Sequence, residues 1–475
     1  MDDTSFSSPT GTDISLEDTI PTSALRQGTL GLRHAIVISV AVMSPAASIF
    51  FNTVPQAGLV GAAIPLCYVV GFIVALLMAN QYSEMSREIP SSGSAYTFVT
   101  AGLGPTWGLL TGWIGFIAVA LGVPYSFILM SANLQTIVQR WLGFDLHWSF
   151  WFVLAIGLVF ALCYIGIRQS LTVDLTLLLF EIGICLLLAV IVLFSVGSQG
   201  KLSATPFTLA ALPPQGDLTT GIVLAVLSFI GFETAAALGE ETRNPHRSIP
   251  RAVYGSMLVV GIFYIIMAYV ATVGYGPDHM VSGYAKDSAP FDTISRHWGG
   301  GVLAAFIDLA GILSFFSAAL AIVNGGARIL YAIGRDGKAL SWLAKTHPDH
   351  RTPVNAVLVL CLFGLVIGLV LGFLLKPINA FAFFGTLDAI FVVLIYGMVN
   401  IACLRFFWRK RRAHFHLLRH GIFPILSTLI IAAIFVAAMV SPGPAPLSYI
   451  PAVVGIWLLL GAIVILVARF MSRPT

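Results

Sequence analysis

Three carboxylates stand inside long apolar stretches of this sequence, where an ionised group is costly. Glu181, Glu233 and Asp388 are each flanked on both sides by mostly apolar residues. An unpaired carboxylate in such surroundings favours the uptake of a proton or the approach of a cation, and acids at membrane depth mark substrate and ion pathways. The chemistry expected of these residues is therefore the binding of a proton, a sodium ion or a substrate ammonium group.

Two of the apolar stretches also contain residues that interrupt a helix. Pro45 stands among small residues in the first stretch, and Gly231 stands two positions before Glu233 in the sixth. Breaks in matching halves of a chain indicate a transporter site, because the start of a half-helix attracts an anion and its end attracts a cation. The two breaks predict a site for a zwitterion such as an α-amino acid. Pro55 predicts a further break in the first stretch.

The elements that carry these residues are membrane helices. Of the 475 residues, 58% are hydrophobic and only 10% are charged, which excludes an ordinary soluble protein. A helix of about 20 apolar residues crosses a bilayer core. Twelve stretches are long enough, near residues 34–58, 61–82, 104–132, 149–167, 171–196, 219–239, 253–276, 300–333, 354–374, 379–404, 421–441 and 447–469. We therefore predict an all-α membrane protein with twelve transmembrane helices.

The distribution of basic residues predicts the orientation of these helices. With both termini in the cytoplasm, only five of the 25 Lys and Arg residues fall outside the cell: Arg140, Lys201, Lys286, Arg296 and Lys376. Such a bias is expected of a multi-pass protein in this orientation, here placed in the plasma (inner) membrane. The same bias explains the net charge of +4, so a nucleic-acid partner is not expected. The expected partners are the lipid bilayer and a small-molecule substrate, and the chain is expected to be a monomer or homodimer.

Three stretches carry patterns that are found in a known family. They are FIGFE at 229–233, EMSREIPSSGSAY at 84–96 and GARILYAIGRDGKAL at 326–340. These motifs resemble those of the amino acid–polyamine–organocation (APC) superfamily of permeases. The resemblance implies a LeuT-type fold of two inverted five-helix repeats, with helices 1 and 6 broken, plus two peripheral helices. The chain then divides into a disordered cytoplasmic tail at 1–33, a transport core at 34–404, a basic cytoplasmic loop at 405–420, and peripheral helices with a short C-terminus at 421–475.

The resemblance also implies where a substrate would bind. Small residues around Pro45 would meet its carboxylate, carbonyl groups near Gly231 would receive its amino group, and an aromatic gating position would fall at Phe232 or Leu227. The substrate-binding candidates are Ser44, Ala46, Ala47, Ser48, Leu227, Phe229, Ile230, Gly231, Phe232 and Glu233. The family's Gly-rich run is replaced here by Ala and Ser, which leave a ligand less room. An amine, or a substrate with a distal carboxylate, is therefore an alternative to a plain α-amino acid.

Glu181 is the first candidate for ion coupling. At its spacing from the YIGIRQS link at 164–170, some proton-coupled members of the superfamily carry a lysine in the place of a sodium ion. We expect Glu181 to carry a proton together with Ser314 and Ser317, or else to serve as a structural acid between helices. Glu233 is the second candidate, and it could equally cap the second half-helix.

The remaining charged residues of interest favour structural roles. For Asp388, structural pairing is favoured over coupling. A network of ion pairs is expected on the inner side, with a solvated loop as the alternative, among Glu240, Glu241, Arg87, Arg243, Arg247 and Arg251.

The predicted function is secondary active transport of amino acids across the plasma membrane by alternating access, coupled to protons or, alternatively, to sodium. An amine or polyamine permease, an amino acid exchanger and a substrate sensor on the same fold are the alternatives. An enzyme is not expected, because the sequence contains neither H-E-x-x-H nor G-x-S-x-G. No catalytic residue, cofactor or metal site is predicted.

Overall fold

The computed structural model describes residue 25 and residues 27–336, 338–440 and 443–471. Within these residues the regular structure is helical, apart from a single bridge between Leu30 and Thr242. The all-α prediction is therefore confirmed. The predicted tail at 1–33 lies mostly outside the described residues, and its disorder stays a prediction.

The described chain contains long helices joined by short connections. The α-helices are α1 (Leu32–Val42), α2 (Pro45–Val60), α3 (Ile64–Glu88), α4 (Ala95–Leu103), α5 (Pro105–Leu142), α6 (Trp148–Ile165), α7 (Ile167–Ser198), α8 (Leu218–Leu227), α9 (Pro245–Tyr275), α10 (Pro290–Asp336), α11 (Val354–Leu375), α12 (Pro377–Arg409), α13 (Phe423–Val440) and α14 (Ile450–Met471). Two further elements matter below, the 3-10 helix η5 (Phe232–Leu238) and the π-helix η10 (Leu417–Ile422). Shorter 3-10 segments are η2 (Gly61–Ala63), η3 (Thr205–Phe207), η4 (Leu209–Ala211), η6 (Pro277–His279), η7 (Tyr284–Lys286), η8 (Lys338–Ala344), η9 (Arg412–His414) and η11 (Leu447–Tyr449).

Eleven segments of the described chain are long and apolar enough to cross a membrane. The first, Leu32–Glu88, is 57 residues long and contains both of the first two predicted spans. Each of the other ten overlaps one predicted span. The chain is a multi-pass membrane protein, whereas the count of twelve spans and the inverted repeat stay predictions.

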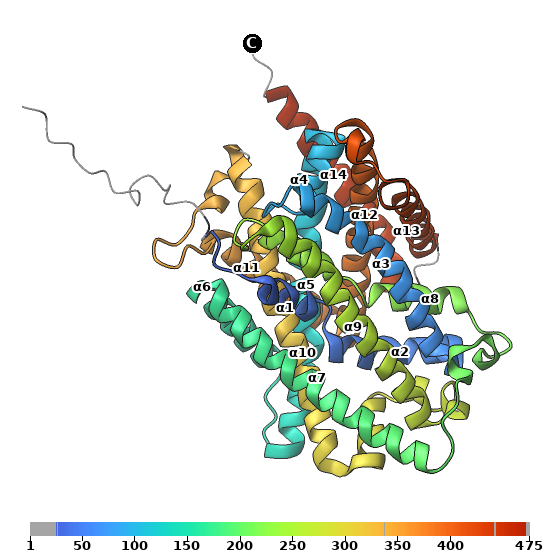
Figure 1. The fold of residues 1–475 in the computed structure, drawn as a ribbon. Coiled ribbons are helices and arrows are strands. Elements are labelled where there is room, and N and C mark those ends of the chain that lie inside the picture. The colour runs from blue at the N-terminus through green and yellow to red at the C-terminus, as the bar shows by residue number, and fades with distance from the viewer. Residues whose placement is uncertain (1–24, 26, 337, 441–442, 472–475) are drawn as a thin grey trace, which may run out of the picture.

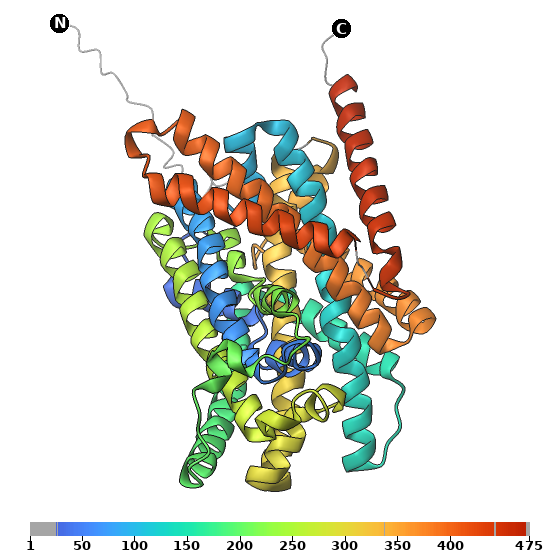
Figure 2. The same cartoon turned by 90° about the vertical axis from the view of Figure 1, so that its right-hand side faces the viewer.

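The long helix α10 forms the centre of the bundle (Figures 1 and 2). It has 47 residues, with a kink at Gly300, and it packs against α1, α2, α5 and α7. The helix α13 lies at the edge of the bundle in Figure 1, and α14 lies at the edge in Figure 2. The helix α13 contacts α3 and α12, and α14 contacts α5. The central position of α10 allows its side chains to meet both broken segments.

Two predicted breaks are present, and one predicted break is not. The first span divides into α1 and α2, and the sixth divides into α8 and η5. Pro55, however, lies inside α2, which continues past it to Val60. The prediction of a break at Pro55 was wrong, because a proline bends a helix without ending it when neighbouring groups satisfy the freed carbonyl.

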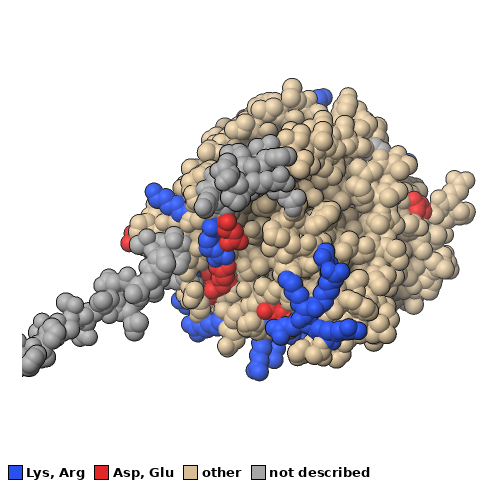
Figure 3. Space-filling model, turned by 90° about the horizontal axis from the view of Figure 1, so that it is seen from above, with Lys and Arg blue, Asp and Glu red and all other residues tan. Residues whose placement is uncertain are grey.

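Lys and Arg side chains gather at one end of the bundle, as Figure 3 shows from above. Ion pairs of Arg335 with Glu240 and of Arg411 with Glu88 lie at this end. We call it the basic end, and we call the other end, where α7 ends and α10 begins, the far end. The basic end is the side that the sequence predicts to be cytoplasmic.

Candidate functional site

The two helix breaks lie against each other inside the bundle. The chain passes from α1 to α2 through Ser44, which is left-handed (φ 48°, ψ 68°), and Pro45 fixes the start of α2. It enters η5 through Gly231 at φ 119°. A Cβ atom on Gly231 would lie 2.5 Å from Val42 Cγ1 and 3.0 Å from Met43 N. Glycine is therefore required here both for the positive φ and for the close approach of the first break.

Side-chain hydrogen bonds join the two breaks. Ser39 on α1 donates to the carbonyl oxygen of Phe232, at 2.8 Å. The Tyr264 hydroxyl on α9 lies 2.6 Å from the carbonyl oxygen of Met43 and 3.0 Å from that of Ser228. A buried carbonyl group that leaves a helix needs another partner. These side chains supply the partners and hold the breaks in register.

Replacement of Gly231 with alanine is expected to destabilise the protein by about 2 to 4 kcal/mol, from the left-handed φ and the clash with Val42. The measurement is the melting temperature of the purified variant in detergent, which should fall by several degrees. Gly157→Ala is the control, because a Cβ atom at Gly157 meets nothing within 4 Å. Equal melting temperatures for the two variants would contradict the close approach at Gly231.

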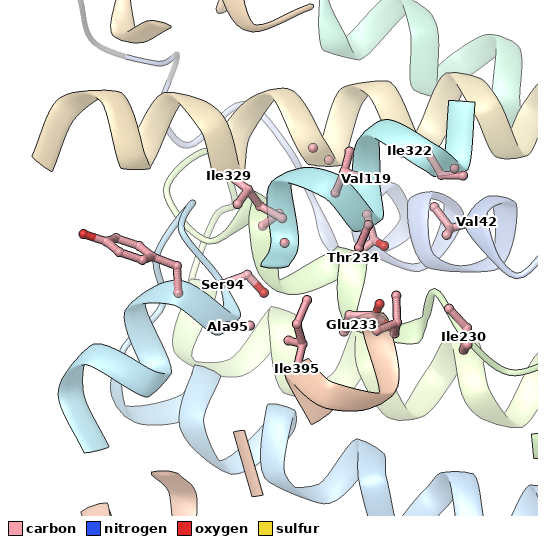
Figure 4. Close-up of a pocket in the computed structure, with 18 of the residues that line it drawn as sticks. Val42, Ser94, Ala95, Val119, Ile230, Glu233, Thr234, Ile322, Ile329 and Ile395 are labelled. Atoms are coloured by element: carbon pink, nitrogen blue, oxygen red, sulfur yellow. The ribbon is translucent and has the colours of Figure 1, made fainter. Parts of the chain in front are cut away.

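A cavity lies against both breaks and extends toward the basic end (Figure 4). Val42 lines it beside the first break and Ile230 lines it within the second, and it reaches Ser94 and the partly exposed Tyr96 at the basic end. It encloses about 790 Å³, part of which is open.

Glu233 is held by a half-helix and by a tyrosine. Its Oε2 atom accepts hydrogen bonds from the Gly231 N–H (3.0 Å) and from the Tyr396 hydroxyl (2.6 Å). A carboxylate at the start of a half-helix is electrostatically favourable. Figure 4 places Glu233 between Ile395 and Thr234 at the edge of the cavity. The residue therefore caps η5 and lines the cavity at once, so its two predicted roles are compatible.

Two further polar groups line the same cavity without a partner. Asp388 on α12 makes no hydrogen bond or ion pair with a described residue, so the structural pairing expected for it is not observed. The hydroxyl of Tyr82, a residue only 1% exposed, also has no hydrogen-bond partner. No Lys, Arg or His among the described residues lines this cavity. Its electrostatic character therefore suits a cationic ligand.

An aromatic cluster lies on the far-end side of the cavity. The ring centroid of Phe51 lies 5.4 Å from that of Phe315 and 6.1 Å from that of Phe381. Tyr125 stacks on Phe381 at 4.7 Å. Phe381 precedes Asp388 on α12 by seven residues, or about 10 Å along the helix. The four rings come from α2, α5, α10 and α12, and Phe381 lies between Asp388 and the far end along α12.

A second group of buried acids lies between α7 and α10. Glu181 is fully buried beside the Ser314 hydroxyl, yet neither of its carboxylate oxygens reaches a partner with hydrogen-bond geometry. Ser314 in turn accepts the N–H of Ala47 in α2, at 3.2 Å. Asp174, about two turns from Glu181, accepts a hydrogen bond from Ser317 (2.9 Å) and leaves Oδ2 unpartnered. Ser314 thus lies at Glu181, whereas Ser317 serves the unpredicted Asp174.

The ion pairs at the basic end differ from those expected. Glu240 pairs with Arg335 (2.9 Å) and accepts from the Ser92 hydroxyl (2.8 Å), while Glu241 forms a buried pair with Arg328. Burial opposes ionisation of Glu240, but its bonds to Arg335 and Ser92 outweigh this effect and hold its pKa below the ordinary value. Both arginines belong to α10, which packs against η5. The predicted arginines of the following loop are not the partners.

The loop after η5 is instead tied to the start of α1. The Leu30 N–H donates to the carbonyl oxygen of Glu241 (3.0 Å), and the Arg243 N–H donates to that of Leu30 (2.8 Å). The Arg243 side chain donates to the carbonyl oxygen of Gly28 (2.6 Å). The two broken segments are therefore joined at the basic end as well as at their breaks.

Replacement of Arg328 with methionine is expected to cost about 3 to 5 kcal/mol, because it leaves Glu241 charged and buried without its partner. Adding Glu241→Gln in the same chain should restore at least half of the lost stability. Arg335→Met breaks a pair whose arginine is 43% exposed, and it should cost less than about 1 kcal/mol. Thermal unfolding of the three variants in detergent measures these differences. Similar losses for Arg328→Met and Arg335→Met would be inconsistent with a buried pair.

The predicted substrate-binding residues fall into two groups. Ile230 and Glu233 line the cavity. The other eight lie in or beside the breaks: Ser44, Ala46, Ala47, Ser48, Leu227, Phe229, Gly231 and Phe232. The Ser48 hydroxyl donates to the Met43 carbonyl (2.8 Å), so two donors of the first break, this hydroxyl and the Ala47 N–H, already have partners. The roles of all ten residues stay predictions.

Sequence reasoning missed three residues of these sites. Asp174 is an acid inside a predicted span, and the criterion that selected Glu181 would also have selected it. Tyr82 and Tyr396 carry no such signal, because tyrosines are common in membrane helices and only helix packing decides which of them meet Glu233.

Together, a bundle of membrane helices and a cavity at two joined helix breaks define a transporter with a LeuT-type fold. The structure is similar to that of Mhp1, a nucleobase-cation-symport-1 family transporter in a closed conformation with bromovinylhydantoin bound. The TM-score is 0.57 at 13% sequence identity, over 91% of this chain and 99% of that one. The family model described as amino acid permease matches residues 34–471. The chain belongs to the amino acid permease family, within the APC superfamily, and is a transporter and not an enzyme.

Its relatives include permeases named for two kinds of substrate. It is 26% identical over 325 residues to the branched-chain amino acid permease BcaP of Bacillus subtilis (strain 168), covering 65% of this chain and 67% of that protein. It is also 26% identical over 423 residues to the low-affinity putrescine importer PlaP of Escherichia coli (strain K12), covering 86% of this chain and 88% of that protein. The predicted relationship of this chain to the APC superfamily is confirmed.

Proposed function

We propose that this protein is a proton-coupled secondary active transporter that moves a small molecule with an amino group across the plasma membrane by alternating access. The observation that carries the proposal is the cavity at the two joined breaks, with Glu233 facing into it. A substrate ammonium group beside Glu233 would replace its lost hydration with a charge-assisted hydrogen bond. Glu233 is the substrate anchor in this account.

The first candidate substrate is an α-amino acid, as the family and the relative BcaP suggest. An amine is the second candidate, and a separate observation favours it. Two donors of the first break that would receive a substrate carboxylate, the Ala47 N–H and the Ser48 hydroxyl, are occupied within the protein. The cavity itself presents acids and no basic side chain among the described residues.

The structure corresponds to one state of the transport cycle in this proposal. If the basic end faces the cytoplasm, the cavity reaches inward while the rings of Phe51, Phe315 and Phe381 close it to the outside. Alternating access then requires these rings to separate and the basic end to close. The tie between the two broken segments makes them move as one unit.

Glu181 is the proposed proton carrier. An ionised carboxylate without a partner costs several kcal/mol in such a place, so Glu181 is expected to hold a proton whenever its surroundings stay closed. Its neighbour Ser314 accepts the Ala47 N–H at the start of α2. Loss of the proton would therefore act directly on the first break, and Asp174 offers a second acid on the same helix.

Uptake by proteoliposomes tests the proposal. Purified protein is reconstituted and supplied with labelled amino acids and amines, with the lumen more alkaline than the sodium-free medium. Accumulation that disappears when the pH gradient is collapsed supports the proposal, and protein-free liposomes are the control. Uptake that requires substrate inside the liposomes indicates an exchanger, and binding without uptake indicates a sensor; either result overturns proton-coupled transport.

A further inference from the structure

We propose that Asp388 forms a second cationic subsite in the cavity, so that the preferred substrates carry two amino groups, as α,ω-diamines do. The inference rests on the proposed transport function and specifies its substrate class. Asp388 is a carboxylate that lines the cavity and has no hydrogen bond or ion pair to a described residue. A carboxylate at this depth in the bundle needs a partner. A ligand bound in the cavity can supply one.

The first subsite lies around Glu233. The side chains of Tyr82 and Tyr396 line the cavity next to it, with ring centroids 5.7 Å apart. Tyr396 donates to Glu233, whereas the Tyr82 hydroxyl is buried and unpartnered. An ammonium group here would meet a carboxylate, a free hydroxyl oxygen and the faces or edges of two aromatic rings. Carboxylate and aromatic groups both attract such a cation.

The second subsite lies along the same face of α12. Asp388, Val392 and Tyr396 are spaced by four residues, so they follow one another on one side of the helix, about 6 Å apart per step. All three line the cavity. Val392 separates the acid at one end from the tyrosine that binds Glu233 at the other. The row therefore has an acid at one end and, at the other, the tyrosine that donates to the Glu233 carboxylate.

Apolar side chains from two other helices also line the cavity and could contact the chain of a diamine. They include Val119 on α5 and Ile322 on α10, which Figure 4 places beyond Thr234 as seen from Glu233. Methylene groups gain by burial against such side chains. A linear diamine therefore matches the cavity at three points, whereas a neutral amino acid would place its carboxylate near acids.

The matched comparison is between 1,4-diaminobutane and n-butylamine, which share a four-carbon chain and differ in one amino group. Half-saturating concentrations are measured by thermal shift of the purified full-length protein, with L-leucine as the zwitterion. The diamine is expected to bind about 10- to 100-fold more tightly than the monoamine, as for a hydrogen bond to a charged group. A series of diamines from three to six carbons should show one best length.

Variants of Asp388 assign this preference to its carboxylate. Asp388→Asn should reduce the advantage of the diamine over n-butylamine to less than threefold. Asp388→Glu should keep the advantage and shift the best chain length shorter, because its longer side chain narrows the gap. Asp308→Asn is the control, since Asp308 is an acid of α10 that does not line the cavity. If neither Asp388 variant folds, the chain-length series on the unaltered protein decides the question.

Two results would overturn the subsite: equal binding of diamine and monoamine by the unaltered protein, or a diamine preference that survives in Asp388→Asn. Failure of the transport function is distinguished by uptake into proteoliposomes. Tight binding of 1,4-diaminobutane without its accumulation leaves the subsite in place and contradicts transport. Accumulation of L-leucine without diamine binding leaves transport in place and contradicts the subsite.

Discussion

Replacement of Glu233 with glutamine is expected to raise the substrate concentration for half-maximal uptake by about 10- to 100-fold. Glutamine has nearly the same shape, and its amide oxygen can still accept from the Gly231 N–H and the Tyr396 hydroxyl. The change therefore removes the negative charge while the cap of η5 is retained. A hydrogen bond to a charged group contributes about 1.5 to 3 kcal/mol, which gives the stated range.

The measurement is the concentration dependence of initial uptake in proteoliposomes, together with the melting temperature of the variant. Glu88→Gln is the matched control, because Glu88 pairs with Arg411 at the basic end and does not line the cavity. It should change half-saturation less than twofold. An affinity for substrate within threefold of the unaltered protein would remove Glu233 from the binding site.

Replacement of Glu181 with glutamine is expected to abolish accumulation driven by a proton gradient. The residue is fully buried and has no hydrogen-bond partner for either oxygen, so it gains most from carrying a proton. Glutamine imitates the protonated acid and cannot release the proton. Uptake by the unaltered protein should rise as the external pH falls, and uptake by the variant should be insensitive to pH.

Counterflow of substrate separates this loss of coupling from a loss of folding. The Glu181→Gln protein should still exchange labelled external substrate for unlabelled internal substrate, because the cavity is intact. Cys185→Ala, one turn further along α7 and equally buried, is the control and should keep its pH dependence. Asp174 would be the coupling acid instead if Glu181→Gln retained its pH response and Asp174→Asn lost it.

The local signals in the sequence predicted the broken helices, because Pro45 and Gly231 act on their own segments of backbone. Pro55 carries a signal of the same kind, but α2 continues through it. The pairing of Glu241 with Arg328 could not be predicted in this way, because the two residues are 87 positions apart and meet only through the packing of α10. The partners of an ion pair depend on the whole bundle.

The carboxylates of the candidate sites were easier to predict from the sequence than the tyrosines around them. A carboxylate in an apolar span is unusual in any context, so Glu181, Glu233 and Asp388 stand out in the sequence. Tyr396 and Tyr82 gain their importance only from the rotation of α12 and α3, which turns them toward Glu233. That Asp388 and Glu233 line one cavity could not be predicted either, because the order of the helices along the chain does not determine which helix faces pack together.

Joint movement of substrate and proton through this chain can be followed by recording substrate uptake and lumenal pH at once, with a pH-sensitive dye inside proteoliposomes in sodium-free buffer. We predict that the amino compound with the highest uptake acidifies the lumen in a fixed ratio to its entry, and that Glu181→Gln abolishes this acidification. Accumulation of that compound without proton movement, or only in the presence of sodium, would contradict the account.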